Sequence, residues 1–113
     1  MILAEVVEKL GLDVKAGNQR LDAVVTRGYV SDLMSDVMVN AREGDLWVTL
    51  QIHQNIVAVA VMKSLSGIIL VNGREPQEET LRKAETEQIP VLVSGMSSFE
   101  LVGQLYQLGI SGN

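Results

Sequence analysis

The fold is decided by residues 46–71, which read LWVTL QIHQ NIVAVAVMKSL SG IILV. Two short, largely apolar runs at 46–50 and 68–71 flank a longer apolar segment at 55–65. Short runs of this kind are typical of strands buried on both faces of a parallel sheet. The middle segment is compatible with a strand or a helix, because β-branched residues alternate with alanine. We expect a buried helix, because strands flank it and Asn55 is a good helix cap.

The alternation of strands and helices continues toward the C-terminus. Pro76 suits the first turn of a helix, and the pattern predicts one over 76–88. Residues 90–93 predict another short buried strand. Ser97 and Glu100 have the spacing of a capping box, which predicts a last helix that ends before a glycine near residue 109. Strands and helices that alternate in this way indicate a parallel sheet covered by helices on both faces.

The N-terminal part predicts a helix over 2–10, strands over 12–15 and 21–26, and a helix over 31–41 with Ser31 as its cap. The early strands are expected to add mixed pairs at one end of the sheet. The whole pattern predicts a three-layer α/β/α fold with a mostly parallel, mixed sheet of about five strands. The length of 113 residues suits a single domain.

The composition excludes several classes of protein. The net charge is −5 with nine scattered basic residues, and an acidic chain without a basic stripe repels nucleic acid. The chain has no cysteine, which removes disulfides and thiolate chemistry. The longest apolar stretch, 56–62, is far too short to cross a membrane, and the N-terminus does not read as a signal peptide. We therefore expect a cytoplasmic protein that binds neither nucleic acid nor membrane.

Polar residues collect where the predicted strands end. The carboxyl ends of parallel strands meet at one edge of a sheet, and the helix N-termini there favour anions. The sequence therefore predicts that a nucleotide or another phosphorylated small molecule would bind at this edge. The alternative is that these residues are the caps and turns that every such loop needs. The candidate ligand-binding residues are Arg27, His53, Asn55, Asn72, Gly73, Arg74 and Ser97.

No catalytic or metal-binding constellation is recognisable. His53 is the only histidine and has no acid beside it in the sequence. The chain has neither a phosphate-binding P-loop with its lysine nor a G-x-S-x-G nucleophile turn. Asp32 and Asp36 could share a helix face and hold a hard cation, but such a pair is more often simply solvated. We expect no enzymatic activity, no metal site and no cofactor.

Self-association is expected from the high apolar content of so short a chain. Hydrophobic residues make up 47% of the sequence, and a small domain covers its apolar surface poorly. The interface is predicted around the apolar side of the 31–41 helix, where methionines suit adaptable contacts. Ordinary core packing of the same side chains is the alternative. The candidate residues for a homodimer interface are Leu33, Met34, Val37, Met38 and Trp47.

Several runs, taken in order, resemble the DRTGG domain family over residues 10–109. They are GYVSDLMS at 28–35, LWVT at 46–49, NIVAVA at 55–60, GIILV at 67–71, IPVL at 89–92 and SSFE at 97–100. The family is similar in fold to the N-terminal domain of HPr kinase/phosphorylase, which lacks the catalytic machinery of the kinase. The resemblance implies an accessory role, because such domains accompany nucleotide-sensing CBS pairs in a regulated pyrophosphatase and occur in phosphotransacetylases. It also implies dimers.

The chain departs from the residues that give the family its name. The Asp-Arg pair of the family aligns by eye with Ile52 and His53, and its Thr-Gly-Gly aligns with residues 71–73, so that Gly73 alone remains. We expect residues 1–113 to form a single domain of this kind, without an attached effector domain. The expected function is a non-catalytic regulatory or adaptor domain that acts by self-association and by docking to a separate effector protein. The alternative is a sensor of nucleotides or other phosphorylated metabolites.

Overall fold

The computed structural model describes all 113 residues as one sheet of five strands with five helices. The elements, in chain order, are α1 (Leu3–Leu10), β1 (Asp13–Ala16), the short 3₁₀ turn η1 (Asn18–Arg20), β2 (Arg27–Val30), α2 (Met34–Asn40), β3 (Asp45–Thr49), α3 (Asn55–Lys63), β4 (Gly67–Leu70), α4 (Glu78–Glu87), β5 (Val91–Val93) and α5 (Ser98–Gln107).

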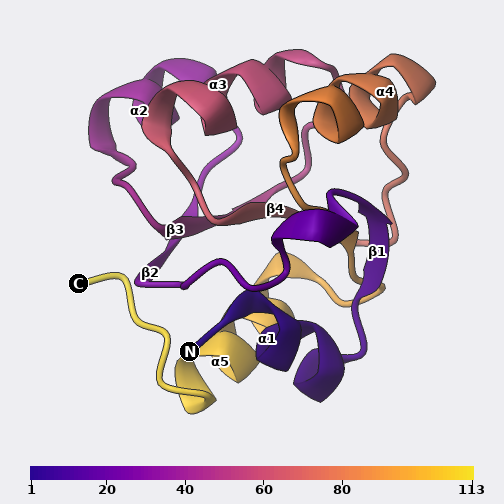
Figure 1. Ribbon diagram of the computed structural model, residues 1–113. Helices are drawn as coiled ribbons and strands as arrows, with labels where there is room; N and C mark the ends of the chain where they lie inside the picture. Colours follow the sequence, from indigo (N-terminus) through magenta and orange to yellow (C-terminus); the bar gives the residue numbers. More distant parts are fainter.

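The sheet has the strand order β1-β5-β4-β3-β2. Strands β2, β3, β4 and β5 are parallel neighbours, and β1 pairs antiparallel with β5 at the far edge. Because each parallel strand lies beside the next one in the chain, the connecting helices α2, α3 and α4 all cover the same face. Figure 1 shows these three helices above the sheet, with α1 and α5 below it. The predicted three-layer α/β/α fold with a mostly parallel, mixed sheet is confirmed.

The ambiguous segment after β3 is a helix, as predicted. Helix α3 buries Ile56, Val57, Val59 and Ala60. It packs between α2 and α4 and covers the middle of the sheet, so that one side faces strands and two sides face helices. This position explains why its sequence is apolar on almost every side, which removes the helical periodicity from the sequence pattern.

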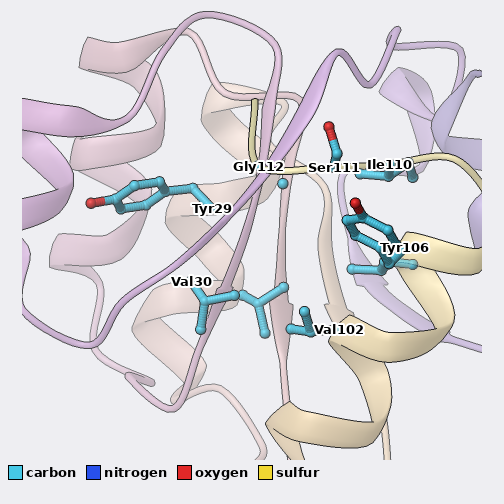
Figure 2. Close-up of a pocket in the computed structure, with 10 residues that line it drawn as sticks. Tyr29, Val30, Val102, Tyr106, Ile110, Ser111 and Gly112 are labelled. Atoms are coloured by element: carbon cyan, nitrogen blue, oxygen red, sulfur yellow. The ribbon is translucent and has the colours of Figure 1, made fainter.

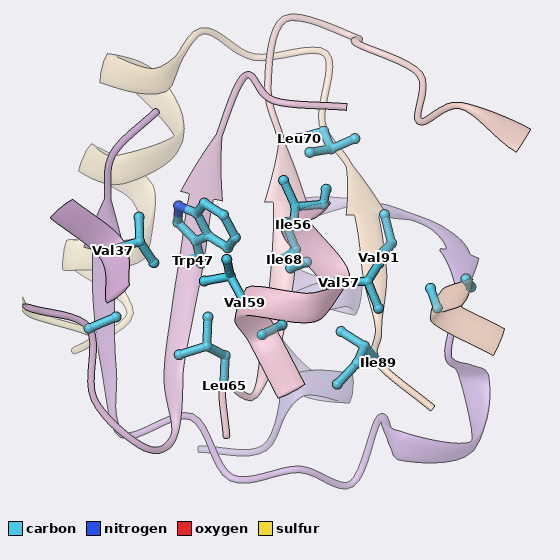
Figure 3. Close-up of a cluster of buried hydrophobic side chains, with 14 of the residues drawn as sticks. Val37, Trp47, Ile56, Val57, Val59, Leu65, Ile68, Leu70, Ile89 and Val91 are labelled. Atoms are coloured by element: carbon cyan, nitrogen blue, oxygen red, sulfur yellow. The ribbon is translucent and has the colours of Figure 1, made fainter. Parts of the chain in front are cut away.

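The core consists of two apolar layers, one on each face of the sheet. The layer under α2, α3 and α4 surrounds Trp47, which Figure 3 shows between Val37 and the residues of α3. The other layer contains Leu46 and Val48 of the same strand, packed with α1 and α5. Successive residues of β3 therefore point to opposite faces and are all buried. This explains the continuous apolar run that marked the strand in the sequence.

The strand predicted over 21–26 is wrong, and the second strand of the chain is β2, which begins at Arg27. The backbone of the predicted segment bonds to the N-terminus instead of to the sheet: Leu3 N donates to Ala23 O, and Val25 N donates to Met1 O, each at 2.9 Å. Gly28 is a poor strand former by sequence, and Arg27 is charged, so neither continues an apolar run. In the fold both pair with β3, where Arg27 finds a buried ionic partner in Asp45.

The three helix caps predicted from the sequence have different outcomes. Ser97 caps α5, because its hydroxyl accepts a hydrogen bond from Glu100 N at 3.3 Å. Asn55 is the first residue of α3 rather than its cap, and no side chain caps that helix. Helix α2 is shorter than the predicted 31–41 segment and begins at Met34 after Leu33, so the prediction that Ser31 caps it is wrong. None of the helices is long and apolar enough to span a bilayer.

Candidate functional site

Six of the seven candidate ligand-binding residues lie in the loops that follow the parallel strands or at the start of the next helix. His53 precedes α3 and Asn55 begins it. The segment Asn72–Arg74 follows β4, and Ser97 caps α5 after β5. All six residues are exposed to solvent. The structure thus brings these residues to the predicted edge of the sheet.

The backbone N–H groups of the Asn72–Gly73 turn donate hydrogen bonds to carbonyl groups of the chain. Both residues have positive φ, 58° and 64°, as in a type I′ turn, and Arg74 N donates to Val71 O at 3.1 Å. Asn72 N donates to Met96 O and Gly73 N donates to Ser94 O, each at 2.8 Å. These bonds join the loops after β4 and β5, where the chain turns to opposite faces of the sheet. The N–H groups that could hold a phosphate there are therefore already occupied.

The electrostatics at this edge are mixed. Glu78 and Glu79 occupy the first turn of α4, and Glu100 occupies the first turn of α5. Acidic side chains at a helix N-terminus use the positive end of the helix dipole and disfavour a second anion. None of the five hollows in the protein surface is lined by any of the six residues. The edge thus offers polar groups without a cavity.

Arg27, the seventh candidate, lies at the opposite end of the sheet. It begins β2 beside Asp45, the first residue of β3, so it stands at the amino ends of the parallel strands. Arg27 is 8% exposed, and its guanidinium binds the Asp45 carboxylate twice, with Nε to Oδ1 at 2.8 Å and Nη2 to Oδ2 at 2.6 Å. The hydrogen bond to Asp45 raises the pKa of Arg27 above its ordinary value. The prediction that Arg27 lies at the carboxyl ends of the strands is therefore wrong. The sequence pattern predicted a strand that ends at residue 26, whereas β2 begins at Arg27.

The Arg27–Asp45 pair joins four parts of the chain. Arg27 Nη2 also donates to Asn40 O at the end of α2, and Nη1 donates to Gly112 O in the C-terminal tail. Asp45 Oδ2 also accepts from Arg42 N at 2.8 Å. A buried charge is tolerated only when its polar atoms are satisfied, and here they are. The Arg27 guanidinium is engaged by groups of the chain itself and is not available to a ligand.

The predicted dimer residues divide into buried and exposed groups. Val37 and Trp47 are fully buried in the core, and Trp47 Nε1 donates to Ser31 O at 2.8 Å. The interface interpretation of these two residues is wrong, because core packing accounts for their burial. Met34 and Met38 are half-buried against the same core, and Leu33 is exposed.

Both aspartates of the 31–41 segment have partners within the chain. Asp32 Oδ1 accepts from Thr49 Oγ1 at 2.8 Å and from Leu50 N at 2.7 Å. Asp36 accepts from the Tyr29 hydroxyl at 2.7 Å. This hydrogen bond lowers the pKa of Asp36 and raises that of Tyr29. No group of three or more histidine, aspartate or glutamate side chains is arranged to hold a metal ion.

The structure has an apolar surface that the sequence analysis did not identify. We call it the α5 face, and it consists of Val30 of β2 with Phe99, Val102, Gly103 and Tyr106 of α5. Phe99 is 87% exposed, Tyr106 66% and Val30 49%. Four of these residues form an i, i+3, i+4, i+7 stripe on α5, in addition to the buried stripe that contains Leu101 and Leu105. This second stripe was the sequence signal for the surface.

A pocket of about 300 Å³ opens between β2, α5 and the C-terminal tail. We call it the edge pocket. Figure 2 shows Val30 and Val102 facing each other beside Tyr106, while the ring of Tyr29 points away. A shallower apolar hollow lies next to the pocket, formed by Val30, Val102, Gly103 and the residues at the start of α5. The edge pocket is lined by Gly28, Tyr29, Val30, Val48, Val102, Leu105, Tyr106, Ile110, Ser111 and Gly112.

Comparison with known proteins gives a family and a fold. No curated protein sequence is significantly similar to this chain. A solved structure of the CBS and DRTGG domains of the regulatory region of Clostridium perfringens pyrophosphatase, complexed with the activator diadenosine tetraphosphate, has a TM-score of 0.74 and 18% sequence identity. The match covers 94% of this chain and 46% of that chain. The sequence model of the DRTGG domain matches residues 5–108, almost the whole length. The chain therefore belongs to the DRTGG domain family.

Proposed function

We propose that this chain is a regulatory domain that associates with itself through the α5 face and thereby acts on an effector. The observation that carries the proposal is the α5 face, a continuous apolar surface with a pocket beside it. The family and the regulatory region of the similar pyrophosphatase support a regulatory role in general. The effector is either a separate protein or a further part of the same protein, and a cytoplasmic setting stays a prediction.

The distribution of charge supports self-association at this face. The chain carries 14 acidic and nine basic residues, and two copies with a net charge of −5 repel each other. Glu100 is the only charged side chain from residue 88 to the C-terminus. The residues of the α5 face are therefore themselves uncharged, and depletion of charge is typical of interface centres.

The two edges of the sheet also differ. Strand β1 has a bulge and the charged side chain of Lys15, which bonds to Glu75 at 3.2 Å; both features discourage pairing with another chain. Strand β2 has no charged side chain exposed at its edge. The C-terminal tail covers it in part, since Gly28 N donates to Ser111 O at 2.9 Å. The β2 edge beside α5 is thus the less protected of the two.

A dilution series followed by amide NMR tests the proposal. Between millimolar and low micromolar concentrations, we expect chemical-shift changes in β2, α5 and residues 110–113. Changes confined to α2 and to the exposed Leu33 that precedes it would contradict the α5 face. Self-association itself would be contradicted if the spectra did not change over this concentration range and the molecular mass stayed that of a monomer.

A second candidate function is a nucleotide sensor at the carboxyl ends of the strands. The observation that favours it is the nucleotide activator in the similar regulatory region. The exposed side chains of His53, Asn55 and Arg74 are the groups that would make contact. A ligand at one hundred times its Kd adds about 2.7 kcal/mol to the free energy of unfolding. Thermal unfolding with diadenosine tetraphosphate and with mononucleotides would therefore reveal binding, and an Arg74→Ala variant should reduce it.

A further inference from the structure

We propose that two copies of this chain associate through a reciprocal contact in which Phe99 of each protomer enters the edge pocket of its partner. This inference rests on the proposed self-association and states how the α5 face is used. The occupant of the pocket is a second copy of the chain, and the contact is a two-fold one.

The Phe99 side chain is exposed to solvent at a position where a second copy could cover it. It is the only phenylalanine of the chain and is 87% exposed at the start of α5. Its neighbours in the shallow hollow, Val30 and Val102, also line the edge pocket. The protruding ring and the pocket are therefore adjacent on one surface but separated by these two valines. This is the arrangement that a two-fold interface needs, because each protomer must supply both the inserted group and its receptor.

The edge pocket suits an aromatic ring. Its volume is about 300 Å³, and seven of its ten lining residues are hydrophobic. The polar groups in its lining include main-chain atoms that already have partners, since Gly28 N bonds to Ser111 O and Gly112 O accepts from Arg27. An apolar group can therefore enter without stranding those polar atoms. Buried aromatic side chains in such pockets are the usual anchors of protein interfaces.

Gly103 gives independent support. A glycine inside a helix weakens the helix relative to alanine. Apart from its two chain neighbours and the backbone of its own helix, no atom of the chain lies within 4 Å of the position that a Cβ at Gly103 would occupy, and its φ is not positive. Nothing inside the molecule therefore requires a glycine at this position. The missing side chain deepens the α5 face between Phe99 and Tyr106, which lets a second copy come close to the helix.

The interface must extend beyond α5. A stable dimer buries on the order of 800 Å² of each partner, to be compared with 5727 Å² for the whole chain. The contact would therefore include the outer edge of β2 and the tail at 110–113, which border the edge pocket. These segments carry no charged side chain that is free at the surface, because the Arg27 guanidinium is paired with Asp45.

Two complementary variants test the reciprocal contact by sedimentation velocity. Phe99→Ala removes the inserted ring and leaves the pocket open. Gly112→Trp keeps the ring and fills the pocket; a Cβ there would meet only Gly28 O at 3.8 Å, an ordinary contact. We expect each variant alone to dimerise on the order of 100-fold more weakly than the unmodified chain, because each dimer loses two anchors. An equimolar mixture should regain association, because one intact ring-in-pocket contact then forms.

The matched control is Leu33→Ala, which trims another exposed apolar side chain, on the opposite side of the sheet. It should dimerise like the unmodified chain. Circular dichroism spectra identical to that of the unmodified chain establish that each variant folds. Gly103→Ala should raise the thermal midpoint of the dilute monomer and weaken the dimer, a combination that a purely structural role does not produce.

The outcomes separate this inference from the proposed function. If the unmodified chain is monomeric throughout, the proposed self-association fails and this inference fails with it. If the unmodified chain dimerises and Phe99→Ala dimerises equally well, the proposed insertion of the Phe99 ring is wrong, while the proposed self-association stands. If both variants are monomeric and their mixture stays monomeric, the contact is not reciprocal and the inference is overturned.

Discussion

The buried side chain of Arg27 connects several segments of the chain at the amino ends of the parallel strands. Its guanidinium forms a double hydrogen bond with Asp45 and also binds carbonyl groups of Asn40 and Gly112. Strand β2, the end of α2 and the C-terminal tail are thereby held together. The burial of these charges is tolerated because every buried side-chain polar atom has a hydrogen-bond partner.

We therefore predict that Arg27→Met destabilises the chain by about 3–5 kcal/mol, since it leaves the Asp45 carboxylate buried and unpaired. The double variant Arg27→Met with Asp45→Leu should recover a large part of the loss, because both charges are then absent. Urea unfolding monitored by the fluorescence of Trp47 measures both effects. A single variant as stable as the unmodified chain would show that the pair is not needed for folding.

The Tyr29–Asp36 hydrogen bond should make stability depend on pH. Because this bond lowers the pKa of Asp36, its contribution is complete above the ordinary aspartate value of 3.8 and is lost as the pH falls through the lower pKa of the folded state. Tyr29→Phe should therefore be less stable than the unmodified chain at pH 6, and the difference should shrink as the pH falls below 3.8. Urea unfolding at a series of pH values measures this.

The matched control for this prediction is Tyr106→Phe. The Tyr106 side chain is exposed, and its hydroxyl makes no hydrogen bond within the chain. Its removal should change the free energy of unfolding by the same small amount at every pH. A difference for Tyr29→Phe that stays constant down to pH 2 would contradict the assigned role of the Asp36 carboxylate.

The helices differ in how their N-termini are stabilised. Ser97 accepts from Glu100 N and caps α5, whereas α3 begins at Asn55 without a side-chain cap. We predict that Ser97→Ala lowers the free energy of unfolding by about 1 kcal/mol. Asn55→Ala should change it by less than about 0.5 kcal/mol, as is usual for an exposed side chain. Denaturant unfolding of the two variants side by side would contradict this account if Asn55→Ala were the more costly.

Much of the architecture could be predicted from the sequence, because the parallel strands are buried on both faces. Strands β3, β4 and β5 consist of apolar residues at nearly every position, and turn or capping residues mark the loops between them. The 27–30 strand could not be predicted in the same way. It begins with Arg27 and Gly28, which do not continue an apolar run, and the pairing of Arg27 with Asp45 across β2 and β3 is visible only in the fold.

The candidate sites could be predicted less well, for a physical reason. Topology alone places residues at the carboxyl ends of the strands, so six of the seven candidates were found there from their order in the chain. Whether a backbone N–H is free depends on contacts between distant loops, such as Gly73 N to Ser94 O. The outward stripe on α5 was visible in the sequence, but the same spacing also describes a buried face, and only the fold shows which face is covered.

The molecule as a whole presents two different surfaces for regulation. The loops after the strands are polar and lack a cavity, while the α5 face is apolar, almost without charge and adjacent to the edge pocket. The proposed association with a second copy uses the α5 face, and the alternative of a nucleotide sensor uses the loops after the strands. A regulatory domain of this design would change the spacing or the orientation of whatever each copy is joined to.

Sedimentation equilibrium of the unmodified chain tests this account most directly, because it measures association without any assumption about the interface. At tens of micromolar we predict a mass close to twice the 12.3 kDa of one chain, falling toward 12.3 kDa on dilution. A mass that stays at 12.3 kDa up to millimolar concentration would contradict self-association and leave the α5 face without the role proposed for it.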